Sequence, residues 1–474
     1  MALLALSSVG VSASYAATLQ VMTDEQLSNT TGQALMSLSY IAPSDSSNLM
    51  TKYSSGSNIG FYKLGLEAEM DLNANIRNLQ LGCGGVNGAG ACDVDIKNLS
   101  LSGLPAGYNA TSGLSPDYSS ANRASTSAKL TNPFMEFAIK NPNVAATREI
   151  AGLRFSAEKI TGLLSAGIEN GLVPSSTDGI QSLSGFMRIA GTTGDVNTLP
   201  TLFGKQADHQ ISGLLNALGF DRQFTSDPAS SDTKGVTVPS INAQFTMPGF
   251  QVNGSRMTSA QVEHVKTKID EISLSDGPNN QLRVTFPAIL GLATSAKIEL
   301  ASGSKIKNLN MDITFNQALS MFHNIPLLGT GGYLSLQQQA LLWPGSYVDE
   351  SDVNATALSQ MSQTDIAQKG WWMSFAEPVQ LGYLKASEQV DISNVLPQVA
   401  TLMTNELLKE ENRVYAPVGA ALGTLFGIKM TTPKPIVVDL NNATIQNPAT
   451  LTLSNLKLAN QNITANCYGS LKFC

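Results

Sequence analysis

Charged residues are scarce in this sequence. Asp, Glu, Lys and Arg form 14% of its 474 residues, against about 25% in ordinary soluble domains. The formal net charge is −7 and no basic cluster occurs, which argues against nucleic acid as a partner. Hydrophobic residues still form 42% of the chain, so the composition is not that of a disordered protein. These values indicate a large, folded protein with a neutral polar surface.

Long apolar runs and catalytic motifs are also lacking. No stretch of about 18 apolar residues occurs, which argues against a transmembrane helix. No phosphate-binding glycine loop, nucleophile elbow or dinucleotide fingerprint is present. The three histidines, His209, His264 and His323, lack the spacing of a metal site or a catalytic pair. We therefore predict no catalytic residue, no metal and no cofactor, and a protein that is not an enzyme.

The beginning of the chain has the pattern of an export signal. Residues 2–13 are apolar, and Ser14-Tyr15-Ala16-Ala17 provides the small residues of a cleavage site. We predict a signal peptide over residues 1–16. No Lys or Arg precedes the apolar run, which departs from the usual pattern, and a buried N-terminal helix is the alternative.

Four cysteines occur as two close pairs, Cys83 with Cys92 and Cys467 with Cys474. An even number of cysteines in an exported chain favours disulfides. Neither pair has CxxC spacing or a histidine nearby, as a zinc or redox site would. We predict two disulfides and an oxidising compartment, with the protein in the periplasm, at the outer membrane or on the cell surface.

The most regular pattern lies within residues 64–104. From Leu64 to Ile76 every second residue is apolar, which predicts one long strand with a single apolar face. With Cys83 opposite Cys92, the returning strand meets it apolar to apolar: Leu81 with Val94, Leu79 with Ile96, Ile76 with Leu99, and Ala74 with Leu101. Both strands change their apolar face where Arg77 meets Asn98. We predict a hairpin of defined register that passes from one core to another.

A loose motif, Ile-x-polar-Leu-x-Leu, accompanies this change of face and recurs. It occurs at Ile76–Leu81, Ile96–Leu101, Ile269–Leu274, Ile306–Met311 and Leu453–Leu458. Because the intervals are irregular, the motif does not indicate a solenoid. We interpret it as one strand geometry used repeatedly in a large β framework.

Shorter patterns predict the remaining elements. Helices are expected at Thr23–Gly32, Ile211–Leu218 and Val395–Leu408, and a buried hairpin or loop at Val414–Ile428. Strands are expected at Ala34–Ile41, Phe134–Ile139, Ile150–Ile160, Gly185–Ile189, Leu282–Phe286, Lys297–Leu300, Trp371–Phe375 and Ile436–Leu440. The predicted fold is mainly β, with elongated antiparallel sheets or a sandwich and a few short amphipathic helices.

Polar loops rich in serine suggest three regions after the signal peptide. Residues 17–125 are expected to hold the N-terminal helix and the disulfide-closed hairpin. Residues 126–350 form a central β-rich region with helical inserts. Residues 351–474 form a C-terminal β-rich region with an amphipathic helix.

Two groups of side chains are candidate binding features. The acids Glu67, Glu69, Asp71, Asp93 and Asp95 gather on the hairpin, but neighbours on one strand face are too far apart for one calcium ion, so we predict a solvated acidic face. The three tryptophans, Trp343, Trp371 and Trp372, predict either a core anchor or a binding platform. The strand-like alternation that continues through Met373 and Phe375 favours the core anchor.

Several segments together resemble a known family. Asp24-Glu25-Gln26-Leu27-Ser28-Asn29-Thr30-Thr31-Gly32-Gln33 is similar to the D-E-x-L-S-x-x-T-G-Q opening of exported Gram-negative proteins of the Fil pilus system, the FilA-like proteins. Residues 132–138, 148–154 and 370–372 are similar as well. The resemblance implies a role in the cell envelope linked to pili and adhesion. It implies no reaction and carries over no catalytic residue.

Two functions follow as hypotheses. The first is a structural or adhesive surface protein of a pilus or filament system, whose partners are other envelope proteins or further copies of itself. The second is an envelope carrier that holds a lipid or another hydrophobic ligand in a groove lined by strands such as Leu64–Ile76. Ordinary sandwich packing of that strand face is the simpler expectation and would remove the groove.

Overall fold

The computed structural model describes residues 36–459, except 55, 86–87, 89, 109–122, 290–292, 331 and 426–427, together with residues 463 and 466. The signal peptide, the helix at Thr23–Gly32 and the pair Cys467 and Cys474 are predictions that lie outside these residues. No helix in the described part is long and apolar enough to cross a membrane.

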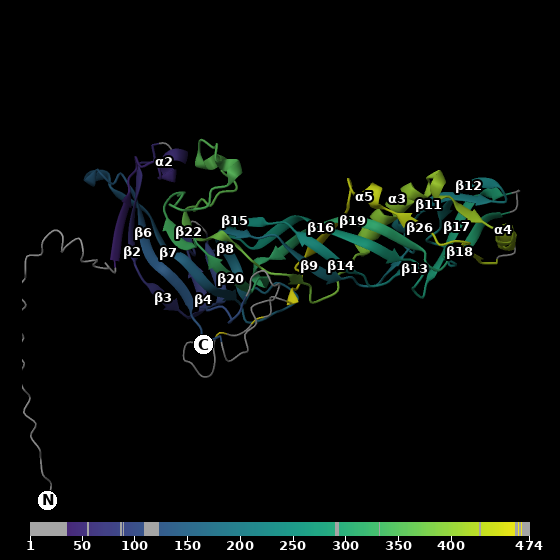
Figure 1. Ribbon diagram of the computed structural model, residues 1–474, viewed down its shortest axis with the longest axis horizontal. Coiled ribbons are helices and arrows are strands. Elements are labelled where there is room, and N and C mark those ends of the chain that lie inside the picture. Colours follow the sequence, from purple (N-terminus) through teal and green to yellow (C-terminus); the bar gives the residue numbers. More distant parts are fainter. Residues whose placement is uncertain are drawn as a thin grey trace, which may run out of the picture.

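Three β-sheets follow one another along the axis of an elongated molecule (Figure 1). A twelve-stranded sheet occupies one end, a seven-stranded sheet the middle and an eight-stranded sheet the other end. The prediction of an elongated, mainly β protein with few short helices is confirmed. The sheets are mixed rather than wholly antiparallel, since β22 pairs in parallel with β8 and β19 pairs in parallel with β27.

The twelve-stranded sheet curls back on itself, because β5 pairs with β8 and also with the far end of β7. Its main path is β1 (Met36–Ile41), β2 (Ile59–Leu66), β6 (Ala128–Lys140), β7 (Glu149–Ala166), β21 (Tyr333–Gln337), β22 (Gly370–Val379), β8 (Gly179–Ile189), β5 (Val94–Ser102) and β4 (Ala74–Leu81). Off this path, β3 (Glu69–Leu72) pairs with β6, β15 (Phe250–Met257) with β8, and β20 (Asn324–Gly329) with β7.

All strands of the two other sheets come after β8 in the sequence. The seven-stranded sheet holds β23 (Leu384–Lys385), β9 (Thr192–Asn197), β14 (Asn242–Met247), β16 (Ser259–Ser273), β19 (Lys305–Ala318), β26 (Val437–Asp439) and β27 (Ala449–Ser454). The eight-stranded sheet holds β10 (Thr201–Phe203), β13 (Gly235–Val238), β17 (Asn280–Ile289), β12 (Phe220–Ser226), β11 (Ser212–Ala217), β24 (Val414–Ala416), β18 (Ala293–Glu299) and β25 (Met430–Thr431).

The regions suggested by the polar loops do not match separate sheets. The twelve-stranded sheet takes β1–β5 from residues 17–125, β6, β7, β8, β15, β20 and β21 from residues 126–350, and β22 from residues 351–474. Strands that lie far apart in sequence therefore depend on one another for their hydrogen bonds.

The predicted register of the disulfide-closed hairpin is confirmed. Cys83 and Cys92 are bonded, and β4 and β5 pair Leu81 with Val94, Leu79 with Ile96, Ile76 with Leu99, and Ala74 with Leu101. The long strand predicted over Leu64–Ile76 is wrong, because the chain is divided among β2, β3 and β4. β2 and β3 both pair with β6, one after the other, whereas β4 turns away to β5.

The helices correct two further expectations. α3 (Leu396–Leu407) confirms the amphipathic helix, with Val399, Met403 and Leu407 buried. The helix expected at Ile211–Leu218 is instead strand β11, whose side chains alternate between buried and half-buried as a paired strand requires. The segment 414–428 was expected to be a buried hairpin or loop, but it contains β24 and the helix α4 (Val418–Leu425), and Val418 and Leu422 are exposed. Two short helices, α2 (Leu49–Tyr53) and α5 (Asn441–Thr444), complete the set among the described residues.

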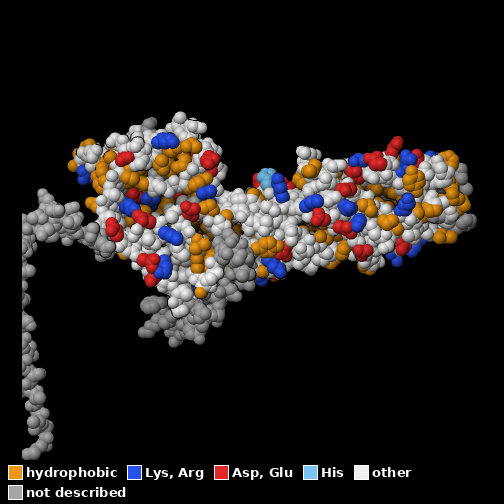
Figure 2. Space-filling view, in the orientation of Figure 1, with side chains coloured by type: hydrophobic (Ala, Val, Ile, Leu, Met, Phe, Trp, Pro, Cys, Tyr) orange, Lys and Arg blue, Asp and Glu red, His pale blue; other side chains and the backbone are white. Residues whose placement is uncertain are grey.

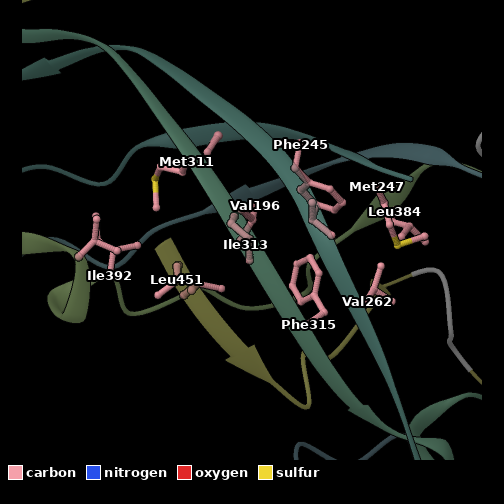
Figure 3. Close-up of a cluster of buried hydrophobic side chains, with 14 of the residues drawn as sticks. Val196, Phe245, Met247, Val262, Met311, Ile313, Phe315, Leu384, Ile392 and Leu451 are labelled. Atoms are coloured by element: carbon pink, nitrogen blue, oxygen red, sulfur yellow. The ribbon is translucent and has the colours of Figure 1, made fainter. Parts of the chain in front are cut away.

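The middle of the molecule is held by a continuous apolar core. Phe245 of β14 and Phe315 of β19 meet with ring centroids 5.9 Å apart, and Ile313 and Leu451 lie beside them (Figure 3). The buried side of α3 packs against this same core. A smaller core under the twelve-stranded sheet holds Trp343 and Trp372.

Candidate functional site: an apolar trough on the twelve-stranded sheet

The two faces of the twelve-stranded sheet differ in how they are covered. One face, which we call the covered face, carries Phe61 and Trp372 and packs against α2 and the segment that contains Trp343. Those three side chains are at most 1% exposed. The opposite face, which we call the open face, carries the next residues along each strand. On β8, β5 and β20 this face packs into the main core, whereas on β1, β2, β6, β7, β21 and β22 its apolar side chains stay partly exposed.

The strand register gathers apolar side chains on the open face into rows that cross six strands. Residues paired directly across antiparallel strands point to the same side of a sheet. One row consists of Leu38, Leu64, Met135, Phe155, Leu334 and Met373. The next row consists of Tyr40, Tyr62, Phe137, Leu153, Leu336 and Trp371. The tyrosine hydroxyls and the indole N–H of Trp371 are the only side-chain polar groups in these two rows.

The curl of the sheet turns this face into a trough with a volume of about 590 Å³. Leu38 is 76% exposed, Leu64 39% and Phe155 41%, although all three lie in the middle of strands. The trough is lined by Met36, Leu64, Leu66, Met70, Leu72, Leu101, Leu130, Pro133, Phe134, Met135, Phe155, Ser156, Ile160, Leu164, Leu327, Gly332, Tyr333, Leu334, Met373 and Phe375. None of these residues is charged, and Ser156 and Tyr333 bear the only side-chain polar groups among them.

The lining includes much of the strand pattern seen in the sequence. Leu64, Leu66, Met70 and Leu72 all line the trough and stay between 36% and 39% exposed. The expectation that this face would be buried by sandwich packing is therefore wrong. Contiguous exposed apolar surface of this kind marks an interaction site, because leaving it in water costs free energy.

A polar network lies beneath the trough, on the covered face. Arg154 forms an ion pair with Glu136, and both side chains are nearly inaccessible to solvent. The guanidinium also donates to the carbonyl of Pro344 at 3.0 Å. The Cζ atom of Arg154 lies 5.2 Å from the centre of the Trp343 ring. These contacts join β6 and β7 to the segment that contains Trp343 on the covered face, and so they stabilise the strands that form the floor of the trough.

Asp365 is the second acid of this network and is fully buried. It accepts hydrogen bonds from Tyr333 Oη at 3.0 Å, Trp372 Nε1 at 3.0 Å and Ser374 Oγ at 2.6 Å. Burial disfavours the charged carboxylate and raises its pKa to about 6 despite these donors. Burial likewise raises the pKa of Glu136, against the opposing effect of Arg154.

The three tryptophans, which were predicted to form a core anchor or a binding platform, lie in two different environments. Trp343 and Trp372 are buried, as the core-anchor alternative predicts. Trp371 is half-buried at the end of the second apolar row, on the open face. The tryptophans thus do not form one surface platform, and only Trp371 adjoins the trough.

The acidic residues that were predicted to form one solvated face also lie in two different environments. Glu69 and Asp71 are exposed and lie near Lys129. Asp93, in contrast, is buried and accepts a hydrogen bond from the backbone amide of Trp371 at 3.0 Å. Among the described residues no group of three His, Cys, Asp or Glu side chains is placed to hold a metal ion.

Two polar cavities accompany the trough. One, of about 750 Å³, lies between β4, β5 and the end of β7. The other, of about 1050 Å³, lies on the seven-stranded sheet beside His264, whose Nδ1 is 3.0 Å from Asp312. Charges of both signs are scattered over the visible face of the molecule, without a large field of one sign (Figure 2).

Sequence reasoning found part of the trough and missed the rest. The alternation from Leu64 to Leu72 was visible, but Phe155, Leu334 and Met373 are brought beside it only by pairing between distant strands. The alternation of Met36, Leu38 and Tyr40 in β1 was the signal that could have extended the prediction. Comparisons of the chain with family models, with curated proteins and with solved structures found no match.

Proposed function

We propose that this protein is an exported, non-enzymatic protein of the cell envelope that binds the acyl chain of a lipid in the apolar trough. The observation that carries the proposal is the uncharged lining of the trough, in which strand residues such as Leu64 and Phe155 remain about 40% exposed. The volume lies within the range of about 300–1,000 Å³ that is usual for small-molecule sites. Binding an acyl chain would remove this surface from water.

The hydrogen bonding of the floor favours an acyl chain over an extended peptide. β2, β6, β7, β21 and β22 each pair with a neighbour on both sides. Their backbone groups are used within the sheet, so the floor offers few partners to the backbone of a peptide laid across it. A peptide backbone without such partners costs several kcal/mol for its desolvated groups, whereas a hydrocarbon chain has no polar group to satisfy.

A charge placed in the trough should weaken this binding. We expect Leu64→Asp and Phe155→Asp each to weaken the binding of a fluorescent fatty-acid probe at least about tenfold, because the carboxylate would be desolvated by the ligand. Both side chains are partly exposed, so the free protein tolerates the charge. Val437→Asp is the matched control, since Val437 lies in β26 of another sheet and is 45% exposed. Equal affinities in all four proteins would refute the proposal.

A surface role in a pilus or filament system is a second proposal, supported by the family resemblance and by one observation. β1 is an edge strand, paired in the described part of the chain with β2 alone. Free strand edges accept further strands from a partner or from another copy. Antibody labelling of intact cells tests this role, and material found only in the soluble periplasmic fraction would count against it.

A further inference from the structure

The end of the molecule opposite the twelve-stranded sheet is apolar (Figure 1). β11 and β24 run toward this end side by side, with Ala217 paired in parallel with Ala416. α4 follows β24, and β12 starts from the turn that follows β11. Five large apolar side chains on or beside these elements stay between 42% and 60% exposed, and we call them the apolar tip: Phe220, Tyr415, Val418, Leu422 and Ile428.

The helix α4 supplies the continuous part of this surface. Val418 and Leu422 are four residues apart, so they lie on one side of the helix. Ile428 lies beside the same helix, since a side chain on Gly423 would meet its Cβ at 3.6 Å. Ala421 packs against the core that β11, β17 and β18 share. The helix is therefore held against the sheet by one side and presents apolar side chains to water on another.

Two uncharged segments of the sequence meet at this end. Residues 414–428 include β24 and α4, and residues 284–296 include the end of β17 and the start of β18. β17 runs antiparallel to β12, so it finishes at the end from which β12 starts. Neither segment contains Asp, Glu, Lys or Arg. On the face shown in Figure 2, hydrophobic side chains reach this end of the molecule and charged side chains lie farther back.

Charges return at the boundaries of both segments, and the first to return are cations. The flanking residues are Arg283, Lys297, Arg413 and Lys429. Each of the four is paired with an acid, which is Asp232, Asp221 or Glu299. These acids are therefore neutralised by cations. An apolar end that is bounded by cations and ion pairs matches the surface of a bilayer, where hydrocarbon lies beneath polar and anionic head groups.

The size and the position of the apolar tip favour a bilayer over a protein as its partner. A stable protein interface takes about 20–30 residues from each side, far more than the five exposed side chains of the tip. Apolar side chains at an extremity need no complementary surface in order to enter a bilayer. α4 has eight residues, too few to span a bilayer, for which about 20 are needed. A short apolar helix can instead bury one side between the head groups and the acyl chains.

We propose that the apolar tip inserts into the surface of a phospholipid bilayer, with Val418, Leu422 and Ile428 among the acyl chains. Tyr415, which has an apolar ring and a polar hydroxyl, suits the level of the head groups. This attachment goes beyond the proposed function and does not depend on the trough, which lies on the sheet at the other end of the molecule (Figure 1).

Flotation with vesicles made of equal parts of phosphatidylethanolamine and phosphatidylglycerol tests the attachment. The wild type should float with the vesicles. Leu422→Asp should lower the partition coefficient at least about tenfold, because the carboxylate would have to leave water. Val437→Asp is the matched control, since Val437 in β26 is 45% exposed, as Leu422 is, and it should float as the wild type does. No flotation of the wild type, or equal flotation of all three proteins, would overturn the proposal.

A tryptophan placed in the tip reports insertion directly. The emission of Val418→Trp should shift to the blue when vesicles are added, and lipids with bromine-labelled acyl chains should quench it. Val437→Trp, exposed on another sheet, should show neither effect. An unquenched tryptophan in Val418→Trp would show that the tip stays in water, and it would overturn the proposal even if the protein floats.

The trough variant separates this inference from the proposed function. Phe155→Asp should float as the wild type does, and Leu422→Asp should still bind the fatty-acid probe. Loss of flotation in Phe155→Asp alone would assign the bilayer contact to the trough and overturn the role of the tip. A wild type that floats through Leu422 but binds no fatty-acid probe would overturn only the proposed function. A lipid-free dimer that Leu422→Asp dissociates would make a second copy the occupant of the tip and overturn the bilayer as its partner.

Discussion

Single asparagines with a left-handed backbone conformation determine which side chains of several strands point to each face of the sheet. Asn98, Asn308 and Asn455 have φ values of 53°, 55° and 54° within or at the end of strands. Each is the third residue of the Ile-x-polar-Leu-x-Leu motif. Asparagine adopts this conformation more readily than most residues with a side chain. The motif therefore has a physical basis at these three positions: one left-handed residue reverses the alternation of the strand.

Replacing Asn308 tests this account of the motif. Asn308→Ala should destabilise the protein by about 1–2 kcal/mol more than Asn308→Gly, because alanine pays the cost of the left-handed conformation and glycine does not. Both variants lose the same two hydrogen bonds to the Asp439 carboxylate, so the difference in their stability isolates the effect of the backbone. Urea denaturation measures it. Equal stability of the two variants would show that the positive φ at this position is without consequence.

Asp365 should make the stability depend on pH. Its pKa rises from the ordinary value of 3.8 to about 6 on folding, so the folded state binds the proton more tightly. The stability gained from that proton is present below about pH 4 and is lost as the pH rises to about 6, a change of about 3 kcal/mol. Asp365→Asn should flatten this part of the pH profile of the free energy of unfolding. A slope between pH 4 and pH 6 that is the same in both proteins would contradict the assignment.

At the scale of elements, the hairpin of β4 and β5 shows what the sequence could predict. Its register follows from two local facts, a close cysteine pair and two alternating strands that change face together. The trough could not be predicted in the same way. Phe155 meets Leu64 only through Met135 of β6, and that alignment depends on long-range pairing. Ile211–Leu218 was misassigned because a short apolar run fits both periods until its partner strand is known.

The disulfide should stabilise this hairpin through the unfolded chain. Cys83 and Cys92 are nine residues apart, and closing a loop of this size is worth about 2–3 kcal/mol. Cys83→Ser combined with Cys92→Ser should lower the free energy of unfolding by that amount. Thermal and urea denaturation of the oxidised wild type and the double variant measure the difference, and the reduced wild type should match the variant. An unchanged midpoint would contradict this estimate.

At the scale of the whole molecule, the middle and the end that holds the twelve-stranded sheet are built differently. The seven-stranded sheet buries its apolar side chains in a continuous core shared with α3. The twelve-stranded sheet buries one face on Trp343 and Trp372, packs part of the other face into the main core and leaves the rest of that face as an open apolar trough. The structure therefore accounts for part of the composition, in which few residues are charged although an ordinary share is hydrophobic. Part of the apolar content that the composition counts lines a trough, where it is available to a ligand.

Mass spectrometry of organic extracts from the protein purified out of the cell envelope tests the central claim most directly. We predict that the wild type carries a stoichiometric acyl lipid and that Phe155→Asp, purified in the same way, carries little or none. The Val437→Asp control should retain the lipid. A wild type free of lipid, or equal amounts of lipid in all three proteins, would contradict the assignment of the trough as an acyl-chain site.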